Sequence, residues 1–76
     1  MKSLIFGYGV TGQSIGRYLE KKGKGFEIYD ENVKGPNIFN TLPNQKKLSS
    51  YEMVYLSPGI NIKKIYADEN LIIFHI

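Results

Sequence analysis

Residues 7–12 read GYGVTG, and they decide the fold because they join a short apolar run to a helical pattern. The run LIF within residues 2–6 predicts a buried strand that ends at this turn. Residues 11–22 then repeat apolar side chains at helical spacing, and Gly23 provides a stop signal. A strand, a glycine-rich turn and a helix are therefore expected to follow one another directly.

Further segments extend this pattern along the chain. Residues 26–30 (FEIYD) alternate apolar and polar side chains and end in an acidic residue, which is typical of a second parallel strand reached through a crossover helix. Glycine, proline and asparagine interrupt residues 31–50, where only a short strand is predicted. The remaining predicted elements are that strand over 37–39, a strand over 53–56, two helical turns over 62–68 and a strand over 71–76.

These elements predict an α/β fold, with one Rossmann-like domain over residues 1–76 and a parallel sheet of four to five strands in the order 3-2-1-4-5. Helices are expected on both faces of the sheet, because right-handed crossovers place them there. In this order the first and fourth strands are neighbours, and a crevice opens at their carboxyl ends. The GYGVTG turn and the turn at residues 57–60 (SPGI) are expected to face each other there.

The composition narrows the classes of partner. The net charge of +3 comes from lysines in scattered pairs without a basic stripe, so the sequence predicts no nucleic-acid interface. The chain has no cysteine, which excludes thiolate metal sites, and its single histidine, His75, has no companion ligands, so no metal site is predicted. The longest apolar stretch, residues 71–74, is far shorter than the roughly 18 residues of a membrane span. We therefore expect a cytoplasmic protein without a membrane span.

Each glycine of the GYGVTG turn has a distinct expected role. Gly7 permits the tight turn, Gly9 lets a ligand approach bare backbone, and Gly12 lets the helix pack against the strand. The positive end of the helix dipole, near Val10 and Thr11, would stabilise a phosphate or pyrophosphate. The alternative is a tight strand-to-helix turn that binds no ligand.

Asp30 and the SPGI turn add further candidate contacts. Asp30 lies 18 residues after Gly12, where dinucleotide-binding proteins place a carboxylate that accepts hydrogen bonds from a ribose. With the glycine pattern alone, it would favour a nicotinamide or adenine dinucleotide. Asp30 also has a plainer interpretation as a carboxylate that caps the following turn. In the SPGI turn, Gly59 would leave a backbone N–H open to a ligand, although Pro-Gly also ends many strands that bind none.

Three segments together carry a family resemblance. They are IFGYGVTGQSIGRYLEKKG at residues 5–23, IYD at 28–30 and YEMVYLSPGI at 51–60. The chain resembles the N-terminal domain of the D-glutamate-adding Mur ligases, the UDP-N-acetylmuramoyl-L-alanine:D-glutamate ligases, over essentially its whole length. The G-x-G part is common to many folds, whereas Thr11 within it, combined with SPGI at this spacing, is much more specific.

The resemblance implies a domain that binds the UDP part of UDP-N-acetylmuramoyl-L-alanine rather than a redox cofactor. Val10 and Thr11 match the turn that lies against the phosphates, and Asp30 matches the acidic residue near the uridine. Glu31 and Asn32 stand where the family often has threonine and arginine, so its uracil contacts do not carry over unchanged. The predicted UDP-binding residues are Gly7, Gly9, Val10, Thr11, Gly12, Asp30, Glu31, Ser57 and Gly59.

The resemblance also implies that residues 1–76 are a fragment of a longer three-domain ligase. Enzymes of this family form an amide through an acyl phosphate, and their other domains hold ATP, Mg and D-glutamate. The chain contains no G-x-x-x-x-G-K-[ST] sequence, so nothing in it is expected to hold ATP. The fragment alone is therefore expected to have no catalytic residue and no cofactor of its own.

Two other functions remain open on the sequence. An NAD- or ATP-binding regulatory domain, of the kind found in potassium-uptake regulators, would use the same glycine-rich turn, although it has no evident need for SPGI. A Rossmann scaffold that only mediates protein interactions would bind no nucleotide at all. A titration that compares UDP with NAD separates these functions.

Overall fold

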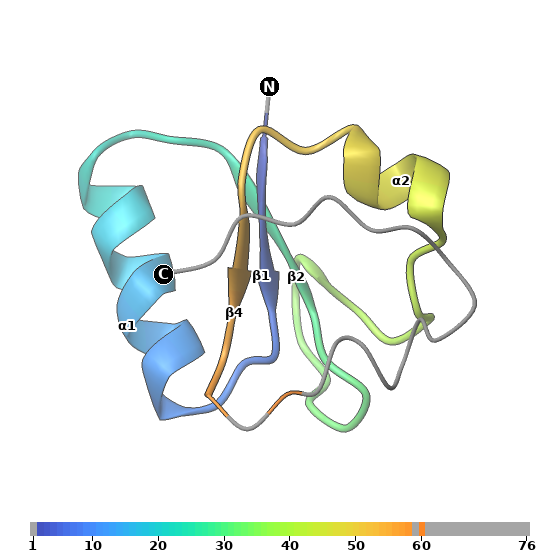
Figure 1. The fold of residues 1–76 in the computed structure, drawn as a ribbon. Coiled ribbons are helices and arrows are strands. Elements are labelled where there is room, and N and C mark those ends of the chain that lie inside the picture. Colours follow the sequence, from blue (N-terminus) through green and yellow to red (C-terminus); the bar gives the residue numbers. More distant parts are fainter. Residues whose placement is uncertain (1, 59, 61–76) are drawn as a thin grey trace.

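The computed structural model describes residues 2–58 and residue 60 of the chain, whose path is drawn in Figure 1. In chain order the described elements are β1 (Ser3–Phe6), α1 (Val10–Lys21), β2 (Phe26–Tyr29), β3 (Ile38–Phe39), α2 (Gln45–Ser49) and β4 (Val54–Leu56). The predicted helical turns over 62–68 and the predicted strand over 71–76 lie outside the described residues.

The four described strands form one parallel sheet in the order β3-β2-β1-β4. β1 is central in this sheet, because Ser3 pairs with Phe26 of β2 and Leu4 pairs with Val54 of β4. β3 adds a two-residue edge beyond β2. The structure thus confirms the predicted α/β class and the predicted order of the first four strands.

The side chains of β1 divide between two apolar clusters, because successive residues of a strand point to opposite faces of the sheet. On one face, Ile5 packs with Leu19 of α1 and Ile28 of β2. Figure 1 shows α1 on one side of the sheet and α2 on the other. The cluster on the α2 side contains Leu4, Phe6, Tyr29, Leu48, Tyr51 and Val54. The predicted coverage of both faces by helices is confirmed.

β1 also fixes the base of the glycine-rich turn. Leu4 and Ile5 have no exposed surface, and Phe6 is 1% exposed. Burying side chains of this size stabilises the fold by about 1.5–3 kcal/mol each. The ring of Phe6 lies 4.8 Å from the ring of Tyr29, between centroids. The chain therefore enters the turn at Gly7 from one of the best-packed points of the described structure.

The short helix α2 is not predicted by the sequence analysis. Its five residues are too few to display helical periodicity among the proline and asparagine residues around them. Asn44 is its N-cap, and the Oδ1 atom of Asn44 accepts a hydrogen bond from the N–H of Lys47 at 2.8 Å. The buried side chain of Leu48 then attaches the helix to the sheet.

Candidate functional site

The GYGVTG turn follows β1, the SPGI turn follows β4, and the structure brings the two turns into direct contact. β1 and β4 are parallel neighbours, so both turns leave the sheet at the same end. The Ser57 hydroxyl donates a hydrogen bond to the carbonyl oxygen of Gly7 at 2.7 Å. The Ser57 N–H donates to the carbonyl oxygen of Phe6 at 3.2 Å. The other predicted site residue of this turn, Gly59, lies outside the described residues.

Packing requires a glycine at positions 7 and 12. Gly7 has a φ of 99°, a conformation that favours glycine. A Cβ atom at Gly7 would also lie 2.6 Å from Cδ1 of Ile60 and 3.0 Å from Oγ of Ser57. A Cβ atom at Gly12 would collide with the carbonyl oxygen of Gly7, so the start of α1 approaches the turn through bare backbone. Gly7 thus forms the tight turn, and Gly12 allows the close packing of the helix.

Gly9 differs from both, because nothing in the described structure requires a glycine there. Its φ of −81° and ψ of −158° are open to residues with side chains. A Cβ atom at Gly9 would meet no atom of residues 2–58 and 60 within 4 Å. The residue is exposed and forms the N-cap of α1. Within the described part of the chain, the space beside Gly9 is therefore open to a ligand.

The N-terminus of α1 carries partial positive charge that no side chain of its own first turn neutralises. Gly9 supplies no side-chain cap, and the first turn contains no acidic residue. Val10 is 84% exposed, and Thr11 is exposed as well. The aligned peptide dipoles give a helix N-terminus roughly half a positive charge. An anion at this point would accept hydrogen bonds from the first N–H groups of the helix.

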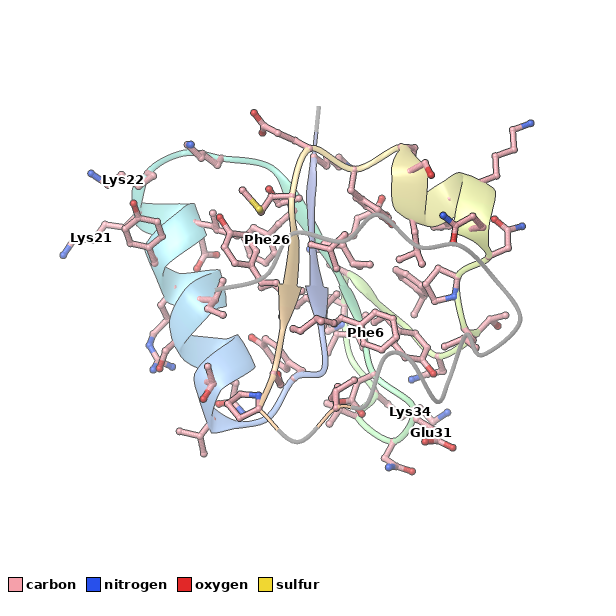
Figure 2. All side chains as sticks on the ribbon, in the orientation of Figure 1. Phe6, Lys21, Lys22, Phe26, Glu31 and Lys34 are labelled. Carbon is pink, nitrogen blue, oxygen red and sulfur yellow. The ribbon has the colours of Figure 1, made fainter. Side chains whose placement is uncertain are left out.

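Lysine side chains are distributed unevenly around α1. Figure 2 shows Lys21 and Lys22 at the far end of the helix, where positive charge complements the helix C-terminus. Lys34 lies in the loop after β2, and its ammonium donates to Oδ1 of Asn40 at 3.4 Å. A phosphate beside Val10 would consequently meet the backbone dipoles of α1 rather than the lysines at its other end.

The carboxylate of Asp30 accepts three backbone hydrogen bonds. Two of them fit the turn-capping role that the sequence predicts as the alternative to a ribose contact. The Oδ2 atom of Asp30 accepts the N–H of Tyr8 at 2.7 Å. Its Oδ1 atom accepts the N–H groups of Asn32 at 2.8 Å and Val33 at 2.9 Å. Burial by itself would raise the pKa of this carboxyl, but the three backbone donors outweigh burial and lower its pKa below the ordinary value. Asp30 therefore caps the turn after β2 as an ionised carboxylate at neutral pH.

Asn40 is a residue of this site that the sequence analysis misses. Its Nδ2 atom donates to the carbonyl oxygens of Asp30 at 2.6 Å and Val33 at 2.9 Å, which closes the loop between β2 and β3. The available signal was an asparagine directly after the short predicted strand, because asparagine side chains often satisfy loop backbone groups. Glu31 is exposed on the same loop (Figure 2).

Two cavities, of about 520 Å³ and about 400 Å³, lie beside the start of β1 and β2, and the larger one also extends along β3. Both are lined by Lys2, Glu27 and Lys47, and no predicted site residue is among their described lining residues. The Tyr51 hydroxyl donates to Glu27 at 2.6 Å, and the Lys2 ammonium lies 3.6 Å from the same carboxylate. The hydrogen bond from Tyr51 is the main cause of a lowered pKa at Glu27. These cavities are therefore separate from the glycine-rich turn.

Comparisons with known proteins found no relatives: no protein-family model matches the chain, and no curated protein or solved structure shows a significant match.

Among residues 2–58 and 60, no three or more histidine, cysteine, aspartate or glutamate side chains are grouped so that they could hold a metal ion. The helices in this part of the chain are too short or too polar to cross a membrane.

Proposed function

We propose that the glycine-rich turn and the first turn of α1 bind the diphosphate of a nucleotide, and that this nucleotide is the UDP moiety of UDP-N-acetylmuramoyl-L-alanine. The N-terminus of α1 carries the proposal, because it is exposed, has no acidic residue in its first turn and begins at Gly9, beside open space. The resemblance of the GYGVTG and SPGI turns to those of the D-glutamate-adding Mur ligases supports UDP over other nucleotides.

The phosphates would be bound mainly by backbone donors. Their oxygens would accept the N–H groups of Val10 and Thr11, and the exposed Thr11 hydroxyl would add another donor. Hydrogen bonds to charged groups contribute about 1.5–3 kcal/mol each. Ser57 would act indirectly, because its hydroxyl holds the carbonyl group of Gly7. The uridine would extend toward the loop after β2.

We further propose that the chain works within an ATP-dependent ligase that joins D-glutamate to this precursor. The chain would bind the UDP substrate, while other domains would hold ATP, Mg and D-glutamate. The lack of a G-x-x-x-x-G-K-[ST] sequence in the 76 residues supports this division of labour. On this proposal the chain acts in the cytoplasm, on a precursor of the cell wall.

A titration of the isotope-labelled 76-residue chain, followed by its backbone amide resonances, tests the choice of nucleotide. UDP is expected to shift the resonances of Gly9, Val10 and Thr11 and to bind more tightly than NAD or ATP. Tighter binding of NAD or ATP would instead assign the chain to the regulatory class. If no nucleotide binds, the turn is a structural feature only.

Gly9→Val tests the location of the site. A branched side chain beside the turn should abolish UDP binding, because the ligand approaches bare backbone there. The variant should still fold, since the native φ of −81° suits valine and a Cβ atom at this position meets no atom of the described residues within 4 Å. Gly25→Val is the matched control, because Gly25 directly precedes β2 at the opposite end of the sheet. A folded Gly9→Val variant that binds UDP like the parent would contradict the proposal.

A further inference from the structure

The carboxylate of Asp30 connects two turns that are distant in the sequence. Tyr8 lies between Gly7 and Gly9, so its hydrogen bond to Asp30 fixes the orientation of a peptide group inside the glycine-rich turn. The other oxygen of Asp30 holds the turn that follows β2, through Asn32 and Val33. The position of the glycine-rich turn is thereby tied to the end of β2.

The number of acceptor positions limits what else Asp30 can bind. A carboxylate offers about four lone-pair positions, two on each oxygen. Oδ1 already accepts two N–H groups, and Oδ2 accepts one. One position on Oδ2 is left, so Asp30 cannot accept the two hydroxyls of a ribose with one oxygen each.

We propose that Asp30 is a positioning residue for the phosphate site and does not recognise the ribose. It holds the Tyr8 peptide so that the N–H groups at the start of α1 face the phosphates. This inference rests on the proposed function, because it assigns to Asp30 a role in binding the same diphosphate. It predicts that the site selects its ligand by the phosphates and that Asp30 contributes nothing to discrimination at the ribose.

The surroundings of Asp30 support this role. Asn40 holds the carbonyl groups of Asp30 and Val33, so the carboxylate sits on a loop that is itself fixed at both sides. The charge of Asp30 opposes the binding of a nearby anion by Coulomb repulsion. Asp30→Asn keeps the size of the side chain, removes the charge and leaves only one oxygen to accept hydrogen bonds. Repulsion alone predicts that this variant binds phosphate more tightly than the parent, whereas the positioning role predicts weaker binding.

The first measurement needs no ligand. In the parent chain, the amide protons of Tyr8, Asn32 and Val33 are expected to shift together as Asp30 is protonated at low pH. In Asp30→Asn, the Tyr8 amide should exchange with solvent faster, while the amide of Leu19 in α1 keeps its protection. Unchanged exchange at Tyr8 in the variant would overturn the assignment.

The second measurement compares the affinities of inorganic pyrophosphate, UDP and 2′-deoxy-UDP for the parent chain and for Asp30→Asn. Pyrophosphate has no ribose, and we expect the variant to bind it about tenfold more weakly, despite the loss of a repelling charge. The ratio of the UDP and 2′-deoxy-UDP affinities should be the same in both proteins. Glu20→Gln removes one charge from an exposed position near the other end of α1 and should leave all three affinities unchanged.

Two results of this comparison would overturn the inference. One is equal or tighter binding of pyrophosphate by the folded Asp30→Asn variant. The other is a preference for UDP over 2′-deoxy-UDP that exists in the parent and disappears in the variant, because that would show a ribose contact. If the parent binds neither pyrophosphate nor UDP, the proposed function fails and the role of Asp30 in phosphate binding fails with it, whereas the Tyr8 amide still reports whether Asp30 orients the glycine-rich turn.

Discussion

At the scale of single residues, the open N-cap at Gly9 makes stability and ligand binding respond in opposite directions to one substitution. In Gly9→Asp, the new carboxylate would accept N–H groups of the first turn and complement the helix dipole. We expect the free energy of unfolding to rise by about 0.5–1 kcal/mol. The same carboxylate would occupy the anion site and repel phosphate, so UDP binding should be lost. Thermal unfolding and a UDP titration measure the two effects.

Gly9→Asn is the matched control for this prediction. Asparagine has nearly the same shape and caps helices well, but it is uncharged. It should retain the part of the gain in stability that comes from capping, and its bulk beside the turn should also prevent UDP binding, as in Gly9→Val. A stabilised Gly9→Asp variant with the affinity of the parent would show that the anion does not bind at this helix terminus.

At the scale of elements, α1 approaches the sheet through two glycines with different surroundings. A Cβ atom at Gly12 would collide with the Gly7 carbonyl, so Gly12→Ala should lower the free energy of unfolding by about 1–3 kcal/mol. A Cβ atom at Gly16 would lie 3.6 Å from Cδ1 of Ile5, which is ordinary contact. Gly16→Ala should therefore raise the free energy of unfolding by about 0.5–1 kcal/mol through helix propensity. Urea unfolding of both variants should give opposite signs, and equal effects would contradict this difference in packing.

The short helix α2 depends on its N-cap, Asn44, for stability. The side chain of Asn44 accepts the N–H of Lys47, and α2 brings Leu48 onto the sheet. Asn44→Ala should lower the free energy of unfolding by about 0.5–2 kcal/mol, whereas Asn44→Asp should preserve it. Urea unfolding distinguishes the two variants. Equal stability of the alanine and aspartate variants would show that the cap contributes little.

At the scale of the whole molecule, two carboxylates of the β2 region attach distant segments of the chain. Glu27 accepts from Tyr51, and Asp30 accepts from Tyr8. The pKa of each carboxyl is lowered in the folded chain, from ordinary values of 4.5 and 3.8. A lowered pKa contributes stability above the ordinary value, and this stability is lost as the pH falls through the folded-state value. Urea unfolding between about pH 5 and pH 2.5 should therefore show a falling free energy of unfolding.

Two variants separate the contributions to this acid sensitivity. Tyr51→Phe removes the main cause of the lowered pKa at Glu27, and Asp30→Asn removes the second carboxyl. Each should be less stable than the parent near neutral pH and should lose less further stability in acid. If both variants keep the full pH dependence of the parent, other groups control the acid response.

The sequence by itself determines the strand, turn, helix and strand unit over residues 2–30 and the order of the first four strands. The alternation of apolar and polar residues, the helical spacing of apolar residues and the glycines at turns are local signals. Each of them can be recognised within one strand or a few helical turns. The sequence also indicates Gly7, Gly9 and Gly12 as a set. It does not show which of them the fold requires, because that depends on the atoms opposite each missing side chain. Only the folded chain separates Gly9, with open space beside it, from the two packed glycines.

Only the tertiary structure decides the long-range partners of Asp30 and Ser57. Asp30 and Tyr8 are 22 positions apart, and Ser57 and Gly7 are 50 positions apart. These hydrogen bonds form once the sheet has placed β1, β2 and β4 side by side, and no periodic pattern within one element encodes them. The sequence pattern presents Asp30 either as a ribose ligand or as a cap of the following turn. The local turn supplies the N–H groups of Asn32 and Val33, and the fold adds the N–H of Tyr8. The physical reason is that a hydrogen bond needs its donor and acceptor about 3 Å apart. For groups far apart in the sequence, the fold decides which of them come that close.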